Sequence, residues 1–470
     1  MVTDLGRTQK WGVLLAIGVG TFMTALDTSV ANTVLPVIGQ SFDETITSVE
    51  WVVTIYLLVL SGLLLSFGRL GDMRGHKTIY LSGFGIFIAG SLLSGVASNI
   101  VLLILFRGLQ ALGAAMLAAN SPAILTKSFP AQQRGQALGL QATMTYLGLT
   151  VGPSLGGWLA SLYGWRVVFY INVPVGLAFI WLGSHFIPSD PLHKSTEKFD
   201  FPGAITFMLG LGALLLGLNK GEEWGWTSIP ILILLFGAVV LLSGFIYIEK
   251  RNAHPMLDLR LFTRFPFSMT TASAIINYLG VYSSIFLMPY YLIEGRGFTP
   301  AQAGLILTAQ PVVMAIIAPI SGTLSDRIGT RLPVVFGMAV LSAGLFFLSR
   351  LGAESDIKTM MMALAVVGLG TGAFISPNNS ALMGSAPKSR QGIAAGILAT
   401  ARNFGMVLGV GIAGAIFTTA LARGTSASIS AGGMAQSGVM FPALQLSFMV
   451  ASGITILGVI TSMVRASSNE

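Results

Sequence analysis

The amino-acid sequence predicts an all-α integral membrane protein, and the two observations behind this are its composition and the length of its apolar runs. Of the 470 residues, 53% are hydrophobic and 9% are charged, whereas soluble domains carry about 25% charged residues. The mean hydropathy is +0.79. A soluble fold of this length has too little interior to bury so much apolar surface, so lipid is the expected solvent.

Fourteen segments are apolar over the length of about 20 residues that a helix needs to cross a bilayer. Lipid leaves only helices and closed barrels as spanning structures, and these runs are too long for barrel strands of about ten residues. The expected spans are 11–36, 50–70, 77–97, 100–124, 136–160, 166–187, 199–219, 228–249, 266–291, 301–324, 332–350, 359–382, 392–421 and 442–464.

Lysine and arginine predict the orientation of these helices. If the N-terminus lies in the cytoplasm, eighteen of the 26 basic residues fall in cytoplasmic loops or tails and six fall outside, while Arg107 and Arg402 lie within spans. This bias is expected of a multi-pass protein of the cell (inner) membrane with both termini in the cytoplasm. The basic residues are scattered and form no patch with aromatics, so nucleic-acid binding is not expected.

The sequence offers no recognisable site for a metal or a cofactor. It contains no cysteine, which excludes a disulfide framework and a thiolate metal site. The four histidines, His76 among them, are placed in or beside cytoplasmic loops and form no cluster. We therefore expect neither a cofactor nor a metal.

A motif that follows the second helix recurs later in the chain. The segment GRLGDMRGHK (68–77) returns as GTLSDRIGTR (322–331), at an offset of 254 residues. A weaker echo at an offset of 257 relates Gly148, Gly152 and Gly157 to Gly405, Gly409 and Gly414. Both offsets correspond to eight helices. We therefore expect an N-terminal six-helix half (1–198), an inserted helix pair (199–249) and a C-terminal six-helix half (250–470).

These motifs resemble signatures of the major facilitator superfamily. The segment 68–77 looks like the signature of the loop between helices 2 and 3, and 148–157 looks like the antiporter motif of helix 5. The segment LDTSVANTVLP (26–36) is similar to the helix 1 signature of the fourteen-helix drug/proton antiporter branch. The helix 4 motif is matched by Arg107, Gln110 and Gly113, and the family's usual pattern is broken by Met73, His76 and Ala111.

The resemblance covers essentially the whole chain and implies a proton-coupled secondary transporter, not an enzyme, that exports amphipathic or lipophilic compounds (multidrug efflux) by alternating access. Its partners would be a small amphipathic molecule or a lipid as substrate, protons and membrane lipids, and the expected assembly is a monomer. A lipid or glycolipid exporter of the same fold is the alternative, because the branch includes lipid exporters. A membrane sensor or scaffold is a more distant alternative, since no large soluble domain is present.

Asp27, together with Arg107, is the expected proton-coupling site. Asp27 alone among the acidic residues is placed deep in a span, about sixteen residues or ~24 Å of helix beyond Trp11, whereas Glu50 is assigned to a loop. A carboxylate at the bilayer centre costs about 2.5–3.5 kcal/mol and normally faces the interior of the bundle. Arg107 is its expected partner in one access state. A purely structural hydrogen bond to a neighbouring helix is the alternative.

The repeated loop motif is expected to form a conformational latch from Gly68, Asp72, Gly75, Lys77 and Asp326. An aspartate aimed at the positive N-terminus of a helix in the other half gains about 0.3–1 kcal/mol. A contact of this kind made in only one access state would shift the equilibrium between the states. An ordinary helix cap or a solvated charge is the alternative for both aspartates.

Helix 5 carries a run of closely spaced residues that favour tight packing: Gly148, Gly152, Pro153, Gly156 and Gly157. Glycines at helical spacing let two backbones approach each other closely. Pro153 also leaves one backbone carbonyl without its helical partner. The resemblance adds that this packing ties helix 5 to the other half and discourages leak.

Polar and aromatic residues within the spans are possible substrate contacts: Asn32, Tyr56, Gln141, Tyr278, Gln310, Asn378 and Arg402. Interhelical hydrogen bonds and interfacial positions are the alternatives for these residues. Arg402 is expected either to contact an anionic group of the substrate or to snorkel. The deep charges of Asp27, Arg107 and Arg402 sum to +1, which suits an anionic amphiphile at least as well as a cation.

Overall fold

The computed structural model describes residues 7–130, 134–188, 200–252, 259–385, 391–430 and 437–467, and all regular secondary structure within these ranges is helical. The first part of the chain forms α1 (Arg7–Phe42), α2 (Ile46–Arg74), α3 (His76–Val96), α4 (Ile100–Ser128), α5 (Arg134–Tyr163), α6 (Val167–Tyr170) and α7 (Asn172–Phe186). The helices α8 (Phe201–Trp224) and α9 (Ile229–Arg251) follow.

The rest of the chain forms a second set of helices. In order they are η2 (Leu259–Thr263), α10 (Phe265–Tyr290), η3 (Tyr291–Gly295), α11 (Pro300–Leu307), α12 (Ala309–Ile328), α13 (Arg331–Leu348), α14 (Ile357–Ser385), α15 (Gln391–Ser430) and α16 (Ser437–Ser467). The sixth predicted span is divided into α6 and α7, and the tenth is divided into α11 and α12 at Thr308.

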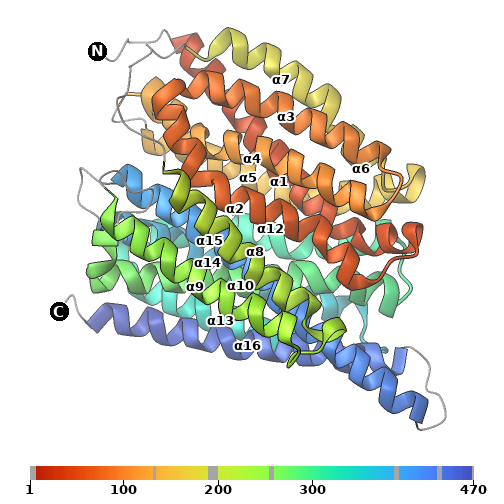
Figure 1. The fold of residues 1–470 in the computed structure, drawn as a ribbon. Helices are drawn as coiled ribbons and strands as arrows, with labels where there is room; N and C mark the ends of the chain where they lie inside the picture. Colours follow the sequence, from red (N-terminus) through yellow and green to blue (C-terminus); the bar gives the residue numbers. More distant parts are fainter. Residues whose placement is uncertain are drawn as a thin grey trace.

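Thirteen helical segments among the described residues are long and apolar enough to cross a membrane. Helix α5, which has 30 residues, is not one of the thirteen and lies between α1 and α11. With α5, the bundle has the fourteen long helical elements that the sequence predicts. The start of α1 and the end of α16 lie at one end of the bundle (Figure 1), and we call the opposite end the far end.

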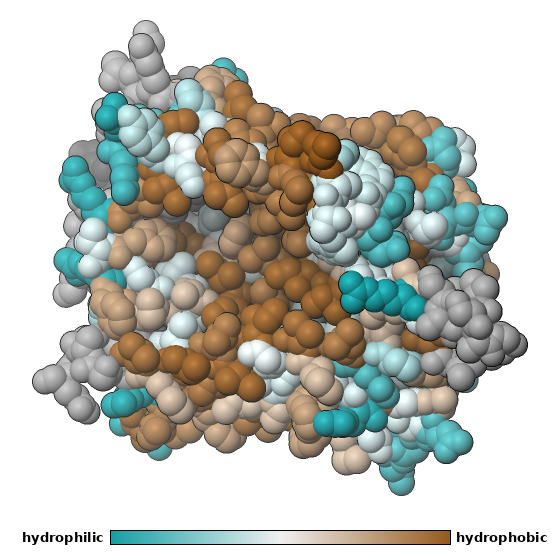
Figure 2. All heavy atoms as spheres, turned by 60° about the horizontal axis from the view of Figure 1, so that its bottom comes forward, coloured by the Kyte–Doolittle hydropathy of each residue, from teal (hydrophilic) through white to brown (hydrophobic). Residues whose placement is uncertain are grey.

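The outer surface has the polarity expected of a protein surrounded by lipid. Figure 2 shows a broad band of hydrophobic residues across the middle of one face, with hydrophilic residues toward both ends. On α9, Ile233 and Phe236 are 65% and 72% exposed. Large apolar surfaces of this kind on the outside of a long helical bundle are covered by acyl chains rather than by water.

The two halves share one packing plan. In the N-terminal half α1 packs on α5 and α7, and α4 packs on α2 and α3. In the C-terminal half α10 packs on α15 and α16, and α14 packs on α12 and α13. The chain is therefore two six-helix halves of the same architecture, and Figure 1 shows them as two layers with α8 and α9 running across their junction.

Equivalent glycines make equivalent contacts in the two halves. A methyl group on Gly113 would overlap backbone atoms of Gly83 and Phe87, because α3 and α4 approach each other at this point. A methyl group on Gly370 would overlap backbone atoms of Gly337 and Leu341 between α13 and α14 in the same way. Gly370 follows Gly113 by 257 residues, and Gly337 follows Gly83 by 254. The two offsets seen in the motifs therefore also relate these close helix contacts of the two halves.

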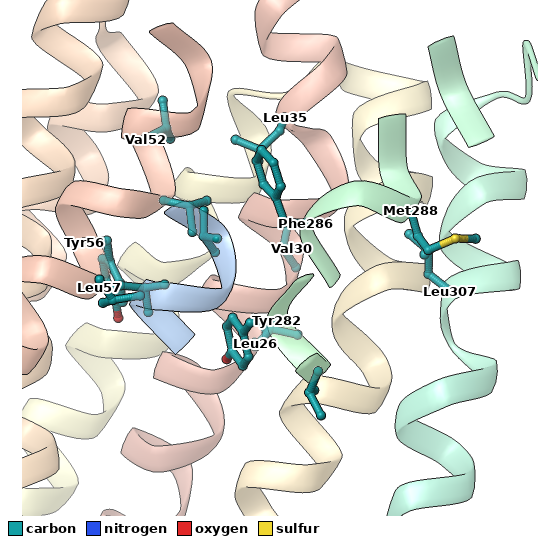
Figure 3. Packing of buried hydrophobic residues seen from close by; sticks show 14 of the residues in the cluster. Leu26, Val30, Leu35, Val52, Tyr56, Leu57, Tyr282, Phe286, Met288 and Leu307 are labelled. Carbon is teal, nitrogen blue, oxygen red and sulfur yellow. The ribbon is translucent and has the colours of Figure 1, made fainter. Parts of the chain in front are cut away.

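The inserted pair stands outside this plan. Helix α9 packs on α8, and α8 packs on α2 of one half and α15 of the other. Directly between the halves, α1 meets α10 and α2 meets α15. Leu26, Val30 and Tyr56 share a buried apolar cluster there with Tyr282 and Phe286 (Figure 3). The interface between the halves is thus apolar over this region.

We expect Gly113→Ala and Gly370→Ala to destabilise the two halves alike, because each added methyl would overlap the backbone of a neighbouring helix. Overpacking of this kind costs about 1–3 kcal/mol, so the midpoint of thermal unfolding in detergent should fall for both. Gly108→Ala on α4 is the matched control, since its added methyl would lie 3.5 Å from the nearest atom, on Ile55. A parent-like midpoint for Gly113→Ala and Gly370→Ala would contradict the close packing.

Candidate functional site

A cavity of about 350 Å³ lies between the two halves. Its wall is formed by α1, α2, α4 and α5 on one side and by α10, α11, α12, α14 and α15 on the other. Among the described residues, none from α8 or α9 lines it. Six of the seven substrate contacts proposed from the sequence line this cavity: Asn32, Tyr56, Gln141, Tyr278, Gln310 and Arg402.

Asn378 is the seventh, and its placement in the wall is wrong. Its side chain is buried and donates to the Thr270 carbonyl at 3.5 Å, so it joins α14 to α10 behind the cavity. The next residue, Asn379, lines the cavity instead. Neighbouring residues on a helix point about 100° apart. A shift of one residue along α14 therefore moves a side chain from the cavity wall into the packed interior between helices.

Asp27 and Arg107 form a buried ion pair between α1 and α4. Arg107 Nη1 donates to Asp27 Oδ2 at 2.6 Å, and the two side chains are 0% and 1% exposed. The same Nη1 also donates to Gln110 Oε1 at 2.6 Å. The pairing that was predicted for Arg107 is therefore formed in this state of the protein.

Amide donors complete the surroundings of the Asp27 carboxylate. Gln110 Nε2 and Asn172 Nδ2 each donate to Asp27 Oδ1 at 2.8 Å. Asn172 lies at the start of α7, so three helices converge on this carboxylate. Two amide bonds and an ion pair offset the cost of desolvating the charge, which is the condition for keeping an ion pair inside a bilayer.

The ion pair sits behind the cavity wall rather than on it. Neither Asp27 nor Arg107 lines the cavity, whereas Tyr56 does. The guanidinium carbon of Arg107 lies 4.3 Å from the centre of the Tyr56 ring, a cation–π contact, and Arg107 Nε donates to the Val52 carbonyl of α2 at 3.3 Å. Tyr56 is therefore the physical link between the charge pair and the cavity.

Arg402 is the one charged side chain among the described residues that line the cavity. It lies on α15, next to Tyr278 of α10, with which it interacts. In the described part of the chain no carboxylate forms an ion pair with Arg402, and its Nε has no hydrogen-bond partner. The C-terminal side of the cavity thus presents an uncompensated positive charge beside an aromatic ring.

The helix 5 motif packs on two different neighbours. Gly148, Gly152 and Gly156 face α1, against Phe22, Ser29 and Val30 respectively. Gly157 faces α11 of the other half, where a methyl group would overlap the Pro300 carbonyl, and Gly304 of α11 approaches the Pro153 carbonyl in return. The motif therefore joins α5 both to its own half and, toward the far end, to the other half.

Pro153 leaves the Leu149 carbonyl without its helical donor, because proline has no N–H. Ser29 Oγ of α1 donates to that carbonyl at 3.2 Å. Ser154, the next residue, shares a hydrogen bond with Thr308 of the C-terminal half. The proline thus exchanges one intrahelical bond for an interhelical one at the point where α5 meets α1 and α11.

The structure shows the surroundings of three of the five residues of the predicted latch, Gly68, Gly75 and Lys77. Gly75 joins α2 to α3 with φ of 92°, which favours glycine, and its N–H donates to the Gly71 carbonyl at 2.9 Å. Lys77 Nζ donates to the Ser184 carbonyl of α7 at 2.8 Å, and a methyl group on Gly68 would meet no described atom within 4 Å. The side chains of Asp72 and Asp326 lie outside the described part of the structure, so their role as a latch stays a prediction.

Two polar residues lie elsewhere than the sequence predicts. The sequence predicts a loop position for Glu50, but α2 begins at Ile46, so Glu50 falls in the second helical turn and is 1% exposed. The missed signal is Thr45, whose side chain accepts from Ser48 N and caps the helix four residues earlier than expected. His76 is also buried, at the start of α3, and its Nδ1 bonds Asn120 Oδ1 at 2.7 Å.

Comparison with known proteins agrees with this architecture. The family model of the Major Facilitator Superfamily matches residues 17–253 and 270–467. The chain is 34% identical over 414 residues to the riboflavin transporter RibZ of Clostridioides difficile, covering 88% of this chain and 89% of the relative. It is 32% identical over 413 residues to the multidrug resistance protein Stp of Mycobacterium tuberculosis, covering 88% and 76%.

Further matches extend the comparison. The tetracenomycin C resistance and export protein of Streptomyces glaucescens is 30% identical over 413 residues, covering 88% of this chain and 77% of the relative. A bacterial homologue of the lysosomal transporter Spinster, solved in an inward-facing conformation, matches with a TM-score of 0.67 at 17% identity over 98% of this chain and 96% of that chain. The POT family transporter PepTSo matches with a TM-score of 0.69 at 14% identity over 99% and 98%.

At these identities the solved structures establish the fold, while the family model and the relatives establish descent. Together with the two equivalent halves and the cavity between them, they show that the chain belongs to the Major Facilitator Superfamily.

Proposed function

We propose that this transporter exports amphipathic or lipophilic compounds in exchange for protons, by alternating access, across the cell (inner) membrane. Both termini would face the cytoplasm, as the distribution of basic residues predicts. The observation that carries the proposal is the buried Asp27–Arg107 pair, which adjoins the cavity through Tyr56. A titratable carboxylate at this depth serves function more often than structure.

The geometry supports competition between a proton and Arg107 for the carboxylate of Asp27. In the paired state Arg107 neutralises Asp27 and is held over the Tyr56 ring. A proton on Asp27 would remove the charge that holds Arg107 in place, and the change would reach the cavity through Tyr56. Proton binding and substrate binding would then bias the same equilibrium between access states, which is what coupling requires.

The cavity wall favours neutral or anionic aromatic amphiphiles as substrates. Arg402 supplies a positive charge, Tyr56, Tyr278 and Tyr282 supply rings, and much of the remaining wall is apolar. The names of the relatives point to aromatic ring systems, riboflavin and tetracenomycin C. Flavins and polycyclic aromatic antibiotics are therefore the first compounds to test in proteoliposomes with an imposed pH gradient. Movement of labelled lipids instead would favour the lipid or glycolipid exporter.

We expect Asp27→Asn to abolish transport driven by a pH gradient, because asparagine keeps the size of the side chain and an acceptor for Gln110 and Asn172 but cannot titrate. Binding of neutral compounds should survive, and Asp27→Glu should keep partial activity. The measurement is pH-gradient-driven transport in liposomes, with binding assayed separately in detergent.

This variant leaves Arg107 buried without its partner, which costs about 3–5 kcal/mol. The double variant Asp27→Asn/Arg107→Gln removes both charges and controls for that cost. Parent rates in a well-folded preparation of either variant would rule out Asp27 as the coupling residue.

We expect Arg402→Gln to weaken the binding of anionic substrates by about 10- to 100-fold, because a hydrogen bond to a charged group contributes about 1.5–3 kcal/mol. Neutral substrates should lose much less, and Arg402→Lys should keep part of the preference for anions. Arg423→Gln is the matched control, since Arg423 lies on the same helix but outside the central cavity and is exposed. Equal losses for anionic and neutral compounds would argue against a charge-specific contact.

A further inference from the structure

Glu50 lies at the far end of the bundle, where α2, α8, α10 and α15 come together. Its side chain is 1% exposed, although it is an acid. One carboxylate oxygen, Oε2, accepts from Asn219 Nδ2 of α8 at 3.2 Å. The other oxygen, Oε1, is buried and has no hydrogen-bond partner among the described residues.

Asn219 is itself clamped onto α2. Its Oδ1 accepts from Trp51 Nε1 at 2.6 Å, and its Nδ2 also donates to the Thr47 carbonyl at 3.1 Å. The inserted helix α8 therefore holds the first two turns of α2 through three hydrogen bonds from one amide. The Glu50 carboxyl group is positioned by this clamp and does not swing freely.

The carboxyl group of Glu50 also crosses to the other half. A methyl group on Gly414 of α15 would lie 2.6 Å from its carboxyl carbon, so the group rests directly on the α15 backbone. Tyr290 of α10 lies near enough to interact electrostatically with Glu50, and its buried hydroxyl has no hydrogen-bond partner in the described part of the chain. Glu50 is thus enclosed by both halves, and it stays enclosed only while their far ends are together.

The described residues place no paired cation against the carboxyl group of Glu50. Within the described ranges no lysine, arginine or histidine forms an ion pair with Glu50. The titratable and charged groups at this end of the surrounding elements are Asp43 and Glu44 of the turn before α2, Tyr290 of α10, Tyr291 and Glu294 of η3, Lys220, Glu222 and Glu223 of α8, and Arg423 of α15. Lys220 is engaged with Glu223 at the surface, and Glu294 and Arg423 are exposed.

The enclosed site therefore accommodates a neutral carboxyl group better than a carboxylate. A buried charge without a partner is far more costly than a buried neutral polar group with one hydrogen bond. If the halves separate at the far end, α2 leaves α15 and water reaches Glu50, where a carboxylate can be hydrated. The two access states thus differ in which protonation state of Glu50 they favour.

We propose that Glu50 is a second proton-binding site, which takes up one proton as the far end closes and releases it as that end opens. The inference rests on the alternating access and the orientation proposed above. In that orientation the far end faces the outside, so protons from outside would favour closure of the outer gate. That direction suits an exporter, because a proton bound outside would return the empty transporter to its cytoplasm-facing state.

The test measures the separation of the halves at the far end. The chain has no cysteine, so Ser98→Cys and Ala353→Cys can be introduced together and spin-labelled. Both residues are exposed, and they lie in the equivalent α3–α4 and α13–α14 connections of the two halves. Pulsed electron spin resonance in nanodiscs then gives the closed and open populations at a series of pH values.

The labelled parent should be closed at low pH, with its closed-to-open ratio falling up to about tenfold per pH unit as the pH rises, as one linked proton requires. Glu50→Gln, which is neutral and keeps the acceptor for Asn219, should stay closed with a ratio that changes less than about twofold per unit. Glu44→Gln is the matched control, an exposed carboxylate in the turn that precedes α2 at the same end, and should respond like the parent.

Two results would overturn the inference: a parent whose distances do not change with pH, or a Glu50→Gln variant that keeps the parent's response. The measurement needs neither substrate nor a pH gradient, so it is independent of the transport assay. A pH-dependent far end in a protein that shows no proton-driven transport would sustain the site at Glu50 and refute the proposed function. Proton-driven transport by a protein whose far end does not respond to pH would refute the site at Glu50 and leave the proposed function standing.

Discussion

The ion pair between Asp27 and Arg107 organises the N-terminal half. Two opposite charges inside a bilayer are stable only when they pair with each other and with nearby hydrogen-bonding groups, because no water hydrates them. Asp27 draws in Gln110 from α4 and Asn172 from α7, while Arg107 reaches the Val52 carbonyl and the Tyr56 ring of α2. Four helices are tied together by one carboxylate and one guanidinium. Removal of either charge would leave its partner unpaired in a medium that cannot hydrate it.

Glycine-mediated contacts provide the rest of the framework, and they do so twice. Hydrophobic burial contributes little to helix association in lipid, so close approach of backbones and interhelical hydrogen bonds carry it. Gly113 and Gly370 occupy equivalent contacts in the two halves. The halves differ in what they place around the cavity: the N-terminal half keeps its acid behind the wall, and the C-terminal half exposes the Arg402 guanidinium on the wall. The Asp27–Arg107 pair and the cavity are thereby separated in space but joined by Tyr56.

The inserted helices α8 and α9 have no counterpart in the two-half architecture, and α8 changes the surroundings of a buried acid, Glu50. Helix α8 lies against α2 and α15, so it contacts both halves on their outer side. Its Asn219 fixes the first turns of α2 and supplies the one hydrogen bond that the carboxyl group of Glu50 makes to the described residues. An added helix pair therefore does more than cover apolar surface, because it shapes the surroundings of an acid that the two halves enclose.

The sequence by itself determined the fold class, the number of helices and the repeat, because each depends on local runs of apolar residues or on motif spacing. It also identified Asp27 and Arg107 as charges within spans and six of the polar or aromatic residues that line the cavity, since polar groups are rare and costly within spans. Tertiary structure decided which of them meet. Asn172 as a ligand of Asp27, Asn379 in place of Asn378 in the wall, and the burial of Glu50 all depend on helix rotation and on where a helix begins. A shift of one residue turns a side chain by about 100°, and hydropathy does not register so small a rotation.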